Sequence, residues 1–586
     1  MKPNVKPFIK LGLFFLLAFS FFNQAALAQV FITHVNVVDP IHQKILTDQT
    51  VKIQGTLIDS LGPAGTLVVP EGAQVVEGKD KFLIPSMTDG AVQLFSDGGF
   101  SSRPDQLAVS TQVPVQSEIE KNKLGLKDVL RRYLDVGITS VFDLGTPGSF
   151  FTGNDSVQSG PASPDILGAG PLLCYQVPTA FKNLRKYGPF VEVHSPAQAI
   201  REVSEVASHH RGFVTLDMAC SIDSEAREDS EQLAVLKAVI TEGHEKGLKV
   251  AVLTTRETNA QSAVEYGCDY LIGDIADQVI TDSLLNEIKQ KKVVVCPVLR
   301  AADNYFESIY RKRKFTTFEL ETANPEFLGS FSEWRASTPG RLPSGSLLTH
   351  NGKSAVQELS REDSLKRVNL KRMASAGVTV IAGSGAGNLG TEHAASYLNE
   401  LQAMKTSGLS NWQVIRAATT RPEGLFSRAG LYGTISKGNP ADLLLLNANP
   451  SANLKNLEKI ACVFKNGRLI LPDTLIAEDP AELVQKQVNG YNYGNIDVFM
   501  DPYADNVGLY QFPDLLLSTG KAAIMNRMES MFKKYPHLHC QITQRLVQGN
   551  YVIDKETISG MNHGETAGTV VYEIAHKKIA KVFLMM

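Results

Sequence analysis

Three polar side chains in the middle of the chain are of types that could do chemistry: Asp274, Ser384 and His393. A serine nucleophile with a histidine base is one hypothesis, because Ser384 lies in the glycine-rich segment 383–387, shortly before His393. The segment lacks the G-x-S-x-G pattern of a nucleophile elbow, and no acid that would orient the histidine is evident. His393 could instead contact a ligand together with Ser384 and Asn388, or bond only to local backbone in a turn that starts a helix.

Asp274 follows a short apolar run and directly precedes residues 275–278, Ile-Ala-Asp-Gln. A carboxylate at the end of a strand could act as an acid at the rim of a site. An aspartate before a helix is more often an N-cap, because its carboxylate accepts a backbone N–H of the first turn. The sequence favours the cap and keeps the catalytic acid as the alternative.

A repeating pattern of short apolar runs and longer helical segments must position these side chains. Alternation of this kind is typical of parallel α/β proteins, and eight units over about 300 residues predict a TIM-type (β/α)8 barrel. In one helical segment, Ser195 and Pro196 form a cap and a first turn. The segment 301–361 is rich in Pro, Ser and Gly and is expected to be an irregular insertion over the barrel mouth. The eight predicted strands are residues 90–95, 138–144, 165–169, 212–218, 249–254, 269–273, 293–299 and 378–383.

The barrel is flanked by two β-rich pieces, which we expect to combine into one composite β-sandwich. An acidic, proline-containing linker then leads to a second unit, and we expect the two to fold separately. The predicted organisation is a leader at 1–28, sandwich parts at 29–85 and 430–472, the barrel at 86–429, the linker at 473–480 and the last unit at 481–586.

Two motifs carry a resemblance to the amidohydrolase superfamily, including its imidazolonepropionase-like and prolidase-like members. LIPSMTDGAVQLF (residues 83–95) resembles the family's first barrel strand, and GTISKGNPADLLLLNANP (433–450) with VFKNGRLI (463–470) resembles its closing segment. The resemblance covers roughly residues 30–475. It implies a hydrolase acting on carbon–nitrogen bonds, with zinc or another divalent metal at the carboxyl ends of the strands.

The positions that the resemblance assigns to metal ligands hold residues that cannot bind a zinc ion well. Zinc sites in proteins use imidazole, carboxylate or thiolate ligands, and none of these stands at any of the six positions. Asp217, near the fourth strand's end, is no automatic substitute, because neighbouring strand residues face opposite sides of the sheet. We therefore predict no metal cofactor. The six positions are Ala91, Gln93, Thr215, Leu253, Gly273 and Gly385.

The order of elements after residue 480 resembles a SnoaL-like, ketosteroid-isomerase-like domain, which implies an α+β cone around an apolar pocket. By this resemblance, the isomerase tyrosine and aspartate fall at Gln487 and Gln511, so isomerase chemistry is not supported. His539 and Asp554 could face each other across neighbouring strands, as a structural or a catalytic pair. Core packing is the alternative for the aromatic members. The candidate ligand-binding residues are Tyr491, Tyr510, Phe532, His539 and Asp554.

The start of the chain reads as an export signal. A basic segment with three lysines precedes an apolar run that is too short to span a bilayer, and Ala26-Leu27-Ala28 fits a cleavage site. We expect cleavage after Ala28 and a periplasmic or extracellular protein. Cleavage would move the net charge from -3 to -6, which argues against nucleic acid or an anionic membrane as a partner. The six cysteines lack a CxxC spacing and are expected to be buried thiols.

Taken together, these features predict an exported amidohydrolase-like pseudoenzyme, with a binding or assembly role and a small-molecule pocket in the cone. Two alternatives stay open. One is a hydrolase of carbon–nitrogen bonds with atypical or absent metal, and the other is activity of the cone on a small apolar molecule. The sequence leaves self-association open.

Overall fold

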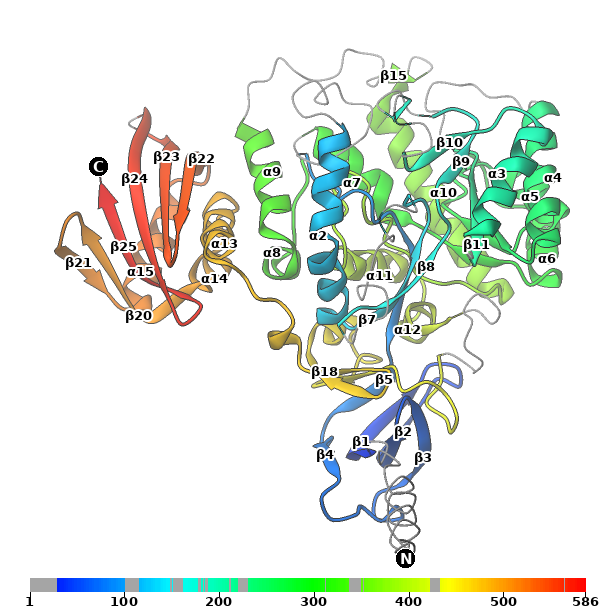
Figure 1. The fold of residues 1–586 in the computed structure, drawn as a ribbon, viewed down its shortest axis with the longest axis horizontal. Coiled ribbons are helices and arrows are strands. Elements are labelled where there is room, and N and C mark those ends of the chain that lie inside the picture. Colours follow the sequence, from blue (N-terminus) through cyan, green and yellow to red (C-terminus); the bar gives the residue numbers. More distant parts are fainter. Residues whose placement is uncertain are drawn as a thin grey trace, which may run out of the picture.

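The computed structural model has an α/β body with a β-sheet piece at one end and a second α+β domain at its side (Figure 1). The predicted signal segment and Cys220 lie outside the described residues. No described helix is long and apolar enough to cross a membrane. The described residues are 29–585, with gaps at 101–114, 148–149, 151–161, 178–180, 183, 185–187, 210–211, 220–229, 311, 337–348, 351–352, 422–432 and 563.

The two β-rich pieces, which were expected to form a composite β-sandwich, join in a single eight-stranded sheet. The central pairing is antiparallel, between Phe82–Pro85 and Leu443–Leu446. Alternating Val and Ile residues from the first strand fill the core beneath. The sheet order is β19-β18-β17-β5-β1-β2-β3, and β4 pairs with β1. The strands are β1 Gln29–Asp39, β2 Lys44–Gln54, β3 Leu57–Pro63, β4 Gln74–Glu77, β5 Phe82–Pro85, β17 Leu443–Leu446, β18 Ile460–Lys465 and β19 Arg468–Ile470.

The α/β body contains parallel strands in two sheets, a six-stranded one in the order β10-β9-β11-β12-β13-β14 and a three-stranded one in the order β6-β7-β8. Seven of the eight predicted strands are observed, with ends shifted by a few residues. The strands β9 and β10 were not predicted. The strands are β6 Met87–Val92, β7 Ile138–Asp143, β8 Asp165–Gly168, β9 Leu172–Cys174, β10 Phe190–Glu192, β11 Phe213–Asp217, β12 Lys249–Leu253, β13 Tyr270–Ile272 and β14 Val294–Cys296.

The predicted eighth strand is not a regular strand, and the described sheets do not form one closed ladder. Its segment makes only isolated parallel bridges, Val295↔Val380 and Val92↔Ala386. The glycine-rich run that follows explains this, because Gly385 and Gly387 have φ values of 68° and 95°, outside the extended region.

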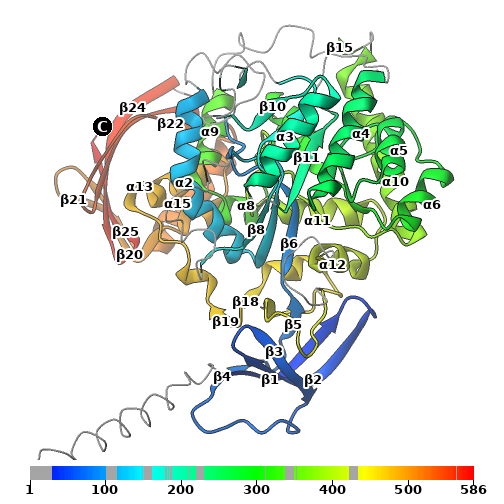
Figure 2. The same ribbon diagram turned by 45° about the vertical axis from the view of Figure 1, so that its right-hand side comes forward.

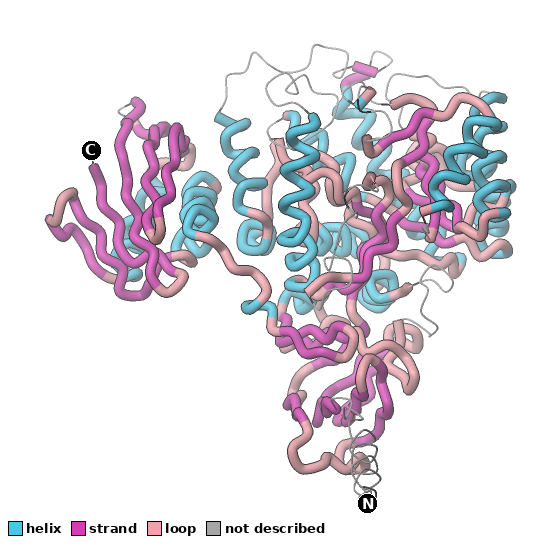
Figure 3. Tube along the Cα trace, viewed as in Figure 1, coloured by secondary structure: helices cyan, strands magenta, loops and turns pink. Residues whose placement is uncertain are grey.

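Helices cover the outside of the α/β body (Figure 3). In α3 the predicted cap is confirmed, since the Ser195 hydroxyl accepts a hydrogen bond from the Gln198 backbone at 3.3 Å and Pro196 follows. In the described part of the segment 301–361 the expectation of an irregular insertion is wrong, because most of these residues are helical. The helices are α2 Val115–Asp135, α3 Pro196–Ser208, α4 Ser230–Glu245, α5 Glu257–Tyr266, α6 Asp282–Gln290, α7 Leu299–Ile309, α8 Thr317–Thr322, α9 Pro325–Ala336, α10 Ala355–Ala376, α11 Tyr397–Thr406 and α12 Asn411–Thr419.

The C-terminal domain is a curved six-stranded sheet in the order β21-β20-β25-β24-β23-β22, with α13 and α15 on its concave side (Figure 2). Its first helix begins with a capping box between Asp479 and Glu482. Its elements are α13 Pro480–Asn492, α14 Ile496–Met500, β20 Tyr503–Gln511, β21 Leu515–Thr519, α15 Lys521–Lys534, β22 His539–Gln548, β23 Tyr551–Met561, β24 Gly564–Ala575 and β25 Lys578–Met585.

The C-terminal domain packs on α8 and α9 of the α/β body. Val498 is fully buried in one apolar cluster with Phe327 and other residues of these helices. The Asn489 side chain, also fully buried, donates a hydrogen bond to the Pro325 carbonyl at 2.8 Å. Side chains of both units therefore form this cluster, and separate folding of the two units stays a prediction.

Candidate functional site

The carboxyl ends of the parallel strands are the first candidate site, and apolar side chains line the space there. Ala91 and Thr215 are buried, with 1% and 0% exposure, and the Thr215 hydroxyl has no hydrogen-bond partner among the described residues. Leu253 and Gln93 are half-buried. These four predicted positions offer a metal one buried hydroxyl and one amide, which is a poor donor set.

Gly273 and Gly385, the other two positions, leave no room for any side chain. Both have positive φ, 97° and 68°. A Cβ at Gly385 would lie 2.5 Å from Val298 Cγ1 and 2.8 Å from Ala301 Cβ, and one at Gly273 would lie 2.7 Å from the Thr254 carbonyl oxygen. Real Cβ atoms do not approach other atoms so closely, so the backbone is built for glycine at both positions.

The space between the strands is filled by a packed apolar cluster. Phe142 lies between Phe213 and Tyr270, with ring centroids 6.2 and 5.5 Å away. The Tyr270 hydroxyl donates to the Gly90 carbonyl at 2.9 Å. Among the described residues, no three His, Cys, Asp or Glu side chains come together as a metal site would require. The residues present therefore do not fit the metal that the family resemblance implies.

Ser384 is bound to a buried carboxylate and does not lie next to a histidine base. Its hydroxyl donates to Asp89 Oδ2 at 2.5 Å, and its backbone N–H donates to Asp89 Oδ1 at 2.8 Å. Burial raises the pKa of Asp89 to about 7, against the opposing effect of these hydrogen bonds. The pair links the glycine-rich segment to β6, which makes Ser384 a structural residue.

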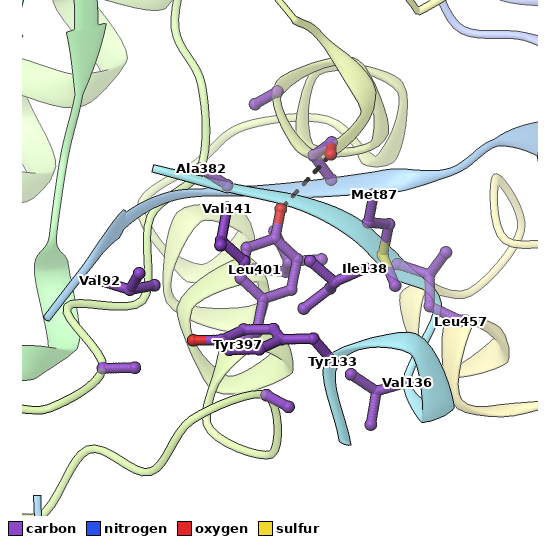
Figure 4. Close-up of a cluster of buried hydrophobic side chains, with 14 of the residues drawn as sticks. Met87, Val92, Tyr133, Val136, Ile138, Val141, Ala382, Tyr397, Leu401 and Leu457 are labelled. Atoms are coloured by element: carbon purple, nitrogen blue, oxygen red, sulfur yellow. Dashed lines mark hydrogen bonds between the residues drawn. The ribbon is translucent and has the colours of Figure 1, made fainter. Parts of the chain in front are cut away.

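His393 is held by two hydrogen bonds that use both ring nitrogens. Nδ1 lies 2.8 Å from the Tyr133 hydroxyl and Nε2 lies 2.8 Å from the Ser96 carbonyl. With Nε2 as the donor, Nδ1 accepts from Tyr133, so the ring is neutral. Burial lowers the pKa of His393 to about 4. Tyr133 and Tyr397 lie side by side in the apolar cluster below (Figure 4). The ring has no free nitrogen for a ligand.

Replacing His393 by alanine is expected to lower the free energy of unfolding by about 2–4 kcal/mol, because a cavity forms and two buried polar groups lose their partner. The His393 pKa is lower in the folded than in the unfolded chain, so its contribution is full above pH ~6.5 and is lost as pH falls towards 4. Urea melts at several pH values test both statements. His42→Ala, at an exposed histidine, is the control and should change stability by less than about 0.5 kcal/mol.

Asp274 does not cap a helix in the residues that directly follow it, so the favoured interpretation of it is wrong. The next helix, α6, begins at Asp282 and is capped by Thr281. Asp274 is buried, and its Oδ1 accepts the Val298 backbone N–H at 3.2 Å, at the start of α7. Burial raises the pKa of Asp274 to about 6. Asn388 donates to the Gly385 carbonyl at 2.8 Å and closes the glycine-rich turn.

The concave side of the C-terminal sheet is the second candidate site. Tyr491 and Phe532, two of the predicted lining residues, contact each other there, with ring centroids 5.7 Å apart. The Tyr491 hydroxyl is buried and has no hydrogen-bond partner in the described part of the chain. Cys540 lies nearby, its Sγ 3.3 Å from Glu556 Oε2. Burial raises the pKa of Glu556, so this carboxyl group holds its proton more firmly than an exposed one.

The other three predicted residues of this domain do not share one side of the sheet, because Asp554 pairs with Val570 of the concave core and Tyr510 lies on the convex side. Tyr510 stacks on Phe583 at 5.1 Å, on the convex side of the sheet. Asp554 forms a two-bond ion pair with Arg545, at 2.6 and 2.7 Å. His539 stands opposite Ser559, so the predicted His539–Asp554 pair does not form, because the register brings Arg545 opposite the aspartate.

The two positions taken for the isomerase residues fit no acid–base role. Gln487 is buried and accepts a hydrogen bond from the Tyr572 hydroxyl at 3.3 Å. Gln511 lies in β20, opposite Leu515 of the edge strand.

Comparison with known proteins agrees with both halves of this description. The amidohydrolase family model matches residues 350–470, and the SnoaL-like domain model matches residues 484–582. The chain is an amidohydrolase-superfamily protein with a C-terminal SnoaL-like domain. No curated protein matches the sequence.

Several solved structures share the fold of this amidohydrolase-superfamily chain. A Xaa-Pro dipeptidase with bound methionine is 16% identical, with a TM-score of 0.57, over 76% of this chain and 100% of that one. A putative prolidase from Bifidobacterium longum is 18% identical, with a TM-score of 0.57, over 76% of this chain and 95% of that one. Molinate hydrolase is 17% identical, with a TM-score of 0.58, over 78% of this chain and 97% of that one. The TM-scores show a common fold, and at these low identities the likeness shows the fold alone.

Several buried ionisable residues of this amidohydrolase-superfamily chain were not singled out from the sequence. Asp89 lies within β6, Asp97 and Glu392 lie in loops, and burial raises the pKa of each, to about 7 for Asp89 and about 6 for Asp97. Glu556 was missed in the C-terminal domain. An isolated acid between apolar residues, as in Met87-Thr88-Asp89-Gly90, is the one signal that could have identified such a position.

Proposed function

We propose that this protein is an exported, non-catalytic member of the amidohydrolase superfamily, in which a TIM-type barrel serves as a binding or assembly scaffold. The observation that carries the proposal is Gly385, whose positive φ and close neighbours exclude the carboxylate that a hydrolytic metal site would need there. The packed apolar cluster between the strands supports it, because hydrophobic side chains fill the place where a hydrolytic site would hold its metal and water. The bridges from Val380 and Ala386 to β14 and β6 support the barrel interpretation.

Elemental analysis tests this proposal. The purified mature protein is expected to contain no stoichiometric zinc, manganese or iron, and a chelator should leave the melting temperature unchanged, because no metal binding is linked to folding. Near one metal ion per chain, with a lower melting temperature after chelation, would restore the metal-dependent hydrolase of carbon–nitrogen bonds as the function.

The same proposal assigns small-molecule binding to the concave side of the C-terminal sheet. The buried Tyr491 hydroxyl has no hydrogen-bond partner among the described residues, and an unsatisfied buried hydroxyl costs about 1–3 kcal/mol. A ligand with an apolar body and one carbonyl oxygen would accept that hydrogen bond and would contact Phe532. Gln487 and Gln511 leave this domain without the acid–base pair of an isomerase, so the proposed role is binding without turnover.

Substituting Tyr491 by phenylalanine is expected to weaken binding of small ketones by about 2–10-fold, because one neutral hydrogen bond is lost. Acetophenone and cyclohexanone, followed by ligand-observed NMR titration, are suitable probes. Tyr510→Phe is the matched control, since this tyrosine lies on the convex side and its hydroxyl should not matter. Equal effects of the two substitutions would contradict a concave site.

A further inference from the structure

Glu556 is a buried acid on the concave side of the C-terminal sheet, beside the ligand position proposed above. The register of β22 and β23 pairs Cys540 with Ile558, and Cys540 belongs to the concave core. Residues paired across strands, and residues two apart along a strand, point to the same side of a sheet, so Glu556 faces the concave side with Ile558. Its side chain lies close to Tyr491, because burial raises the pKa of Tyr491 and the charges of Cys540 and Glu556 raise it further.

One oxygen of the Glu556 carboxyl group is available as an acceptor. Its Oε2 accepts the Cys540 thiol at 3.3 Å, while its Oε1 accepts no hydrogen bond from any residue that the structure describes. Arg545 of the adjacent strand is occupied by Asp554, to which it donates two hydrogen bonds. Within the described chain, no cation therefore forms an ion pair with Glu556, although the residue is only 8% exposed.

The concave side thus combines a buried donor and a buried acceptor that both lack a partner in the described residues. The Tyr491 hydroxyl can donate, and the Glu556 carboxylate can accept. A ketone supplies an acceptor for the tyrosine but no donor for the carboxylate. A carboxylate ligand also supplies only acceptors, and its charge has the same sign as that of Glu556. A carboxamide carries an acceptor and a donor on neighbouring atoms, so it satisfies both groups.

We propose that the concave site selects a carboxamide with an apolar body, with Tyr491 donating to its carbonyl oxygen and Glu556 accepting its N–H. This inference rests on the proposed small-molecule site and names the class of its ligand. Phe532, Ile542 and Ile558 are half-buried at the edge of the same apolar cluster, and they would contact the apolar body. Glu556 is then the specificity-determining residue, because a ligand without the N–H leaves a buried carboxylate unpaired.

Benzamide, acetophenone and benzoate form a matched series of probes, since they share a ring and a carbonyl carbon and differ in one group. Ligand-observed NMR titrations of the full mature chain at pH 8 favour the carboxylate form of Glu556, whose pKa is raised by burial. Benzamide should bind about tenfold more tightly than acetophenone, because it adds a hydrogen bond to a charged acceptor. Benzoate should bind at least about tenfold more weakly than benzamide, because two anions would meet in a buried site.

Glu556→Gln removes the charge and keeps the shape of the side chain. The preference for benzamide over acetophenone should fall to about threefold or less, and benzoate should bind about tenfold more tightly than it does to the unmodified chain. Glu573→Gln is the matched control. Glu573 belongs to the same sheet but lies on the convex side, where Lys581 pairs with it at 3.0 Å. This control should keep the affinities of all three probes.

The comparison of the three probes on the unmodified chain needs no variant, so it tests the selectivity even if Glu556→Gln does not fold. Acetophenone or benzoate binding as tightly as benzamide would overturn the selection of carboxamides and leave the proposed ketone site in place. An unchanged preference in Glu556→Gln would overturn the role of Glu556. Absence of binding by all three probes would overturn the proposed small-molecule site and this inference with it.

Discussion

Replacing Asp442 by alanine is expected to lower the free energy of unfolding by about 3 kcal/mol, because the buried cations Arg421 and Lys465 lose their buried anion and keep only the partly exposed Asp165. Asp442 Oδ2 lies 3.1 Å from Arg421 and 2.9 Å from Lys465, and all three side chains are at most 4% exposed. Burial alone would raise the pKa of Asp442, but Arg421 and Lys465 hold it below its usual value. Its contribution should therefore be present above pH ~4 and be lost below that.

The matched control is Asp282→Ala, which removes an aspartate of the same type from an exposed ion pair. Asp282 lies 2.6 Å from Arg372, but its side chain is 88% exposed. Exposed pairs contribute little, so the loss should stay below about 1 kcal/mol. Thermal and urea unfolding of both variants measure the difference. Equal losses would mean that burial of the Asp442 cluster does not control its effect.

Placing an aspartate at Gly385 is expected to destabilise the protein by about 3 kcal/mol or more and to create no metal site. The substitution adds the carboxylate that a family hydrolase would carry, but its Cβ would lie within 2.8 Å of both Val298 and Ala301. The cost combines backbone strain at positive φ with overpacking. Unfolding curves with and without added zinc measure both effects.

Gly377→Asp separates these two costs. Gly377 has a similar φ of 79°, but a Cβ there would meet nothing within 4 Å. Its replacement should cost only about 1 kcal/mol of backbone strain. Stoichiometric zinc binding by the Gly385 variant, or a loss no greater than that of the control, would show that this backbone can accept a ligand after all.

Local patterns predicted most of the parallel strands, because each is a short apolar run bounded by turn residues, as in residues 249–253. The same patterns predicted a strand wrongly where glycines with positive φ interrupt the extended backbone. The run 378–383 is apolar like the others, but the glycines after it leave the ladder with isolated bridges.

The six positions that the resemblance assigns to metal ligands could be named from motifs because each lies within or shortly after a predicted strand. The roles of Ser384 and His393 could not, since their partners are Asp89 and Tyr133, which are 295 and 260 residues away in the chain. Sequence spacing carries no information on such pairs. The side of the sheet on which Tyr510 lies depends on register, and a shift of one residue reverses it.

The pairing of β5 with β17 has a consequence for how the chain folds. Pro85 pairs with Leu443, and Phe82 with Leu446, so the N-terminal sheet stays incomplete until more than 350 further residues have been made and brought back to it. Contacts this distant in sequence form slowly, and an unpaired strand edge is prone to aggregation while it waits. Refolding should show an early compact state in which β5 lacks amide protection, and a chaperone that shields this edge should raise the yield.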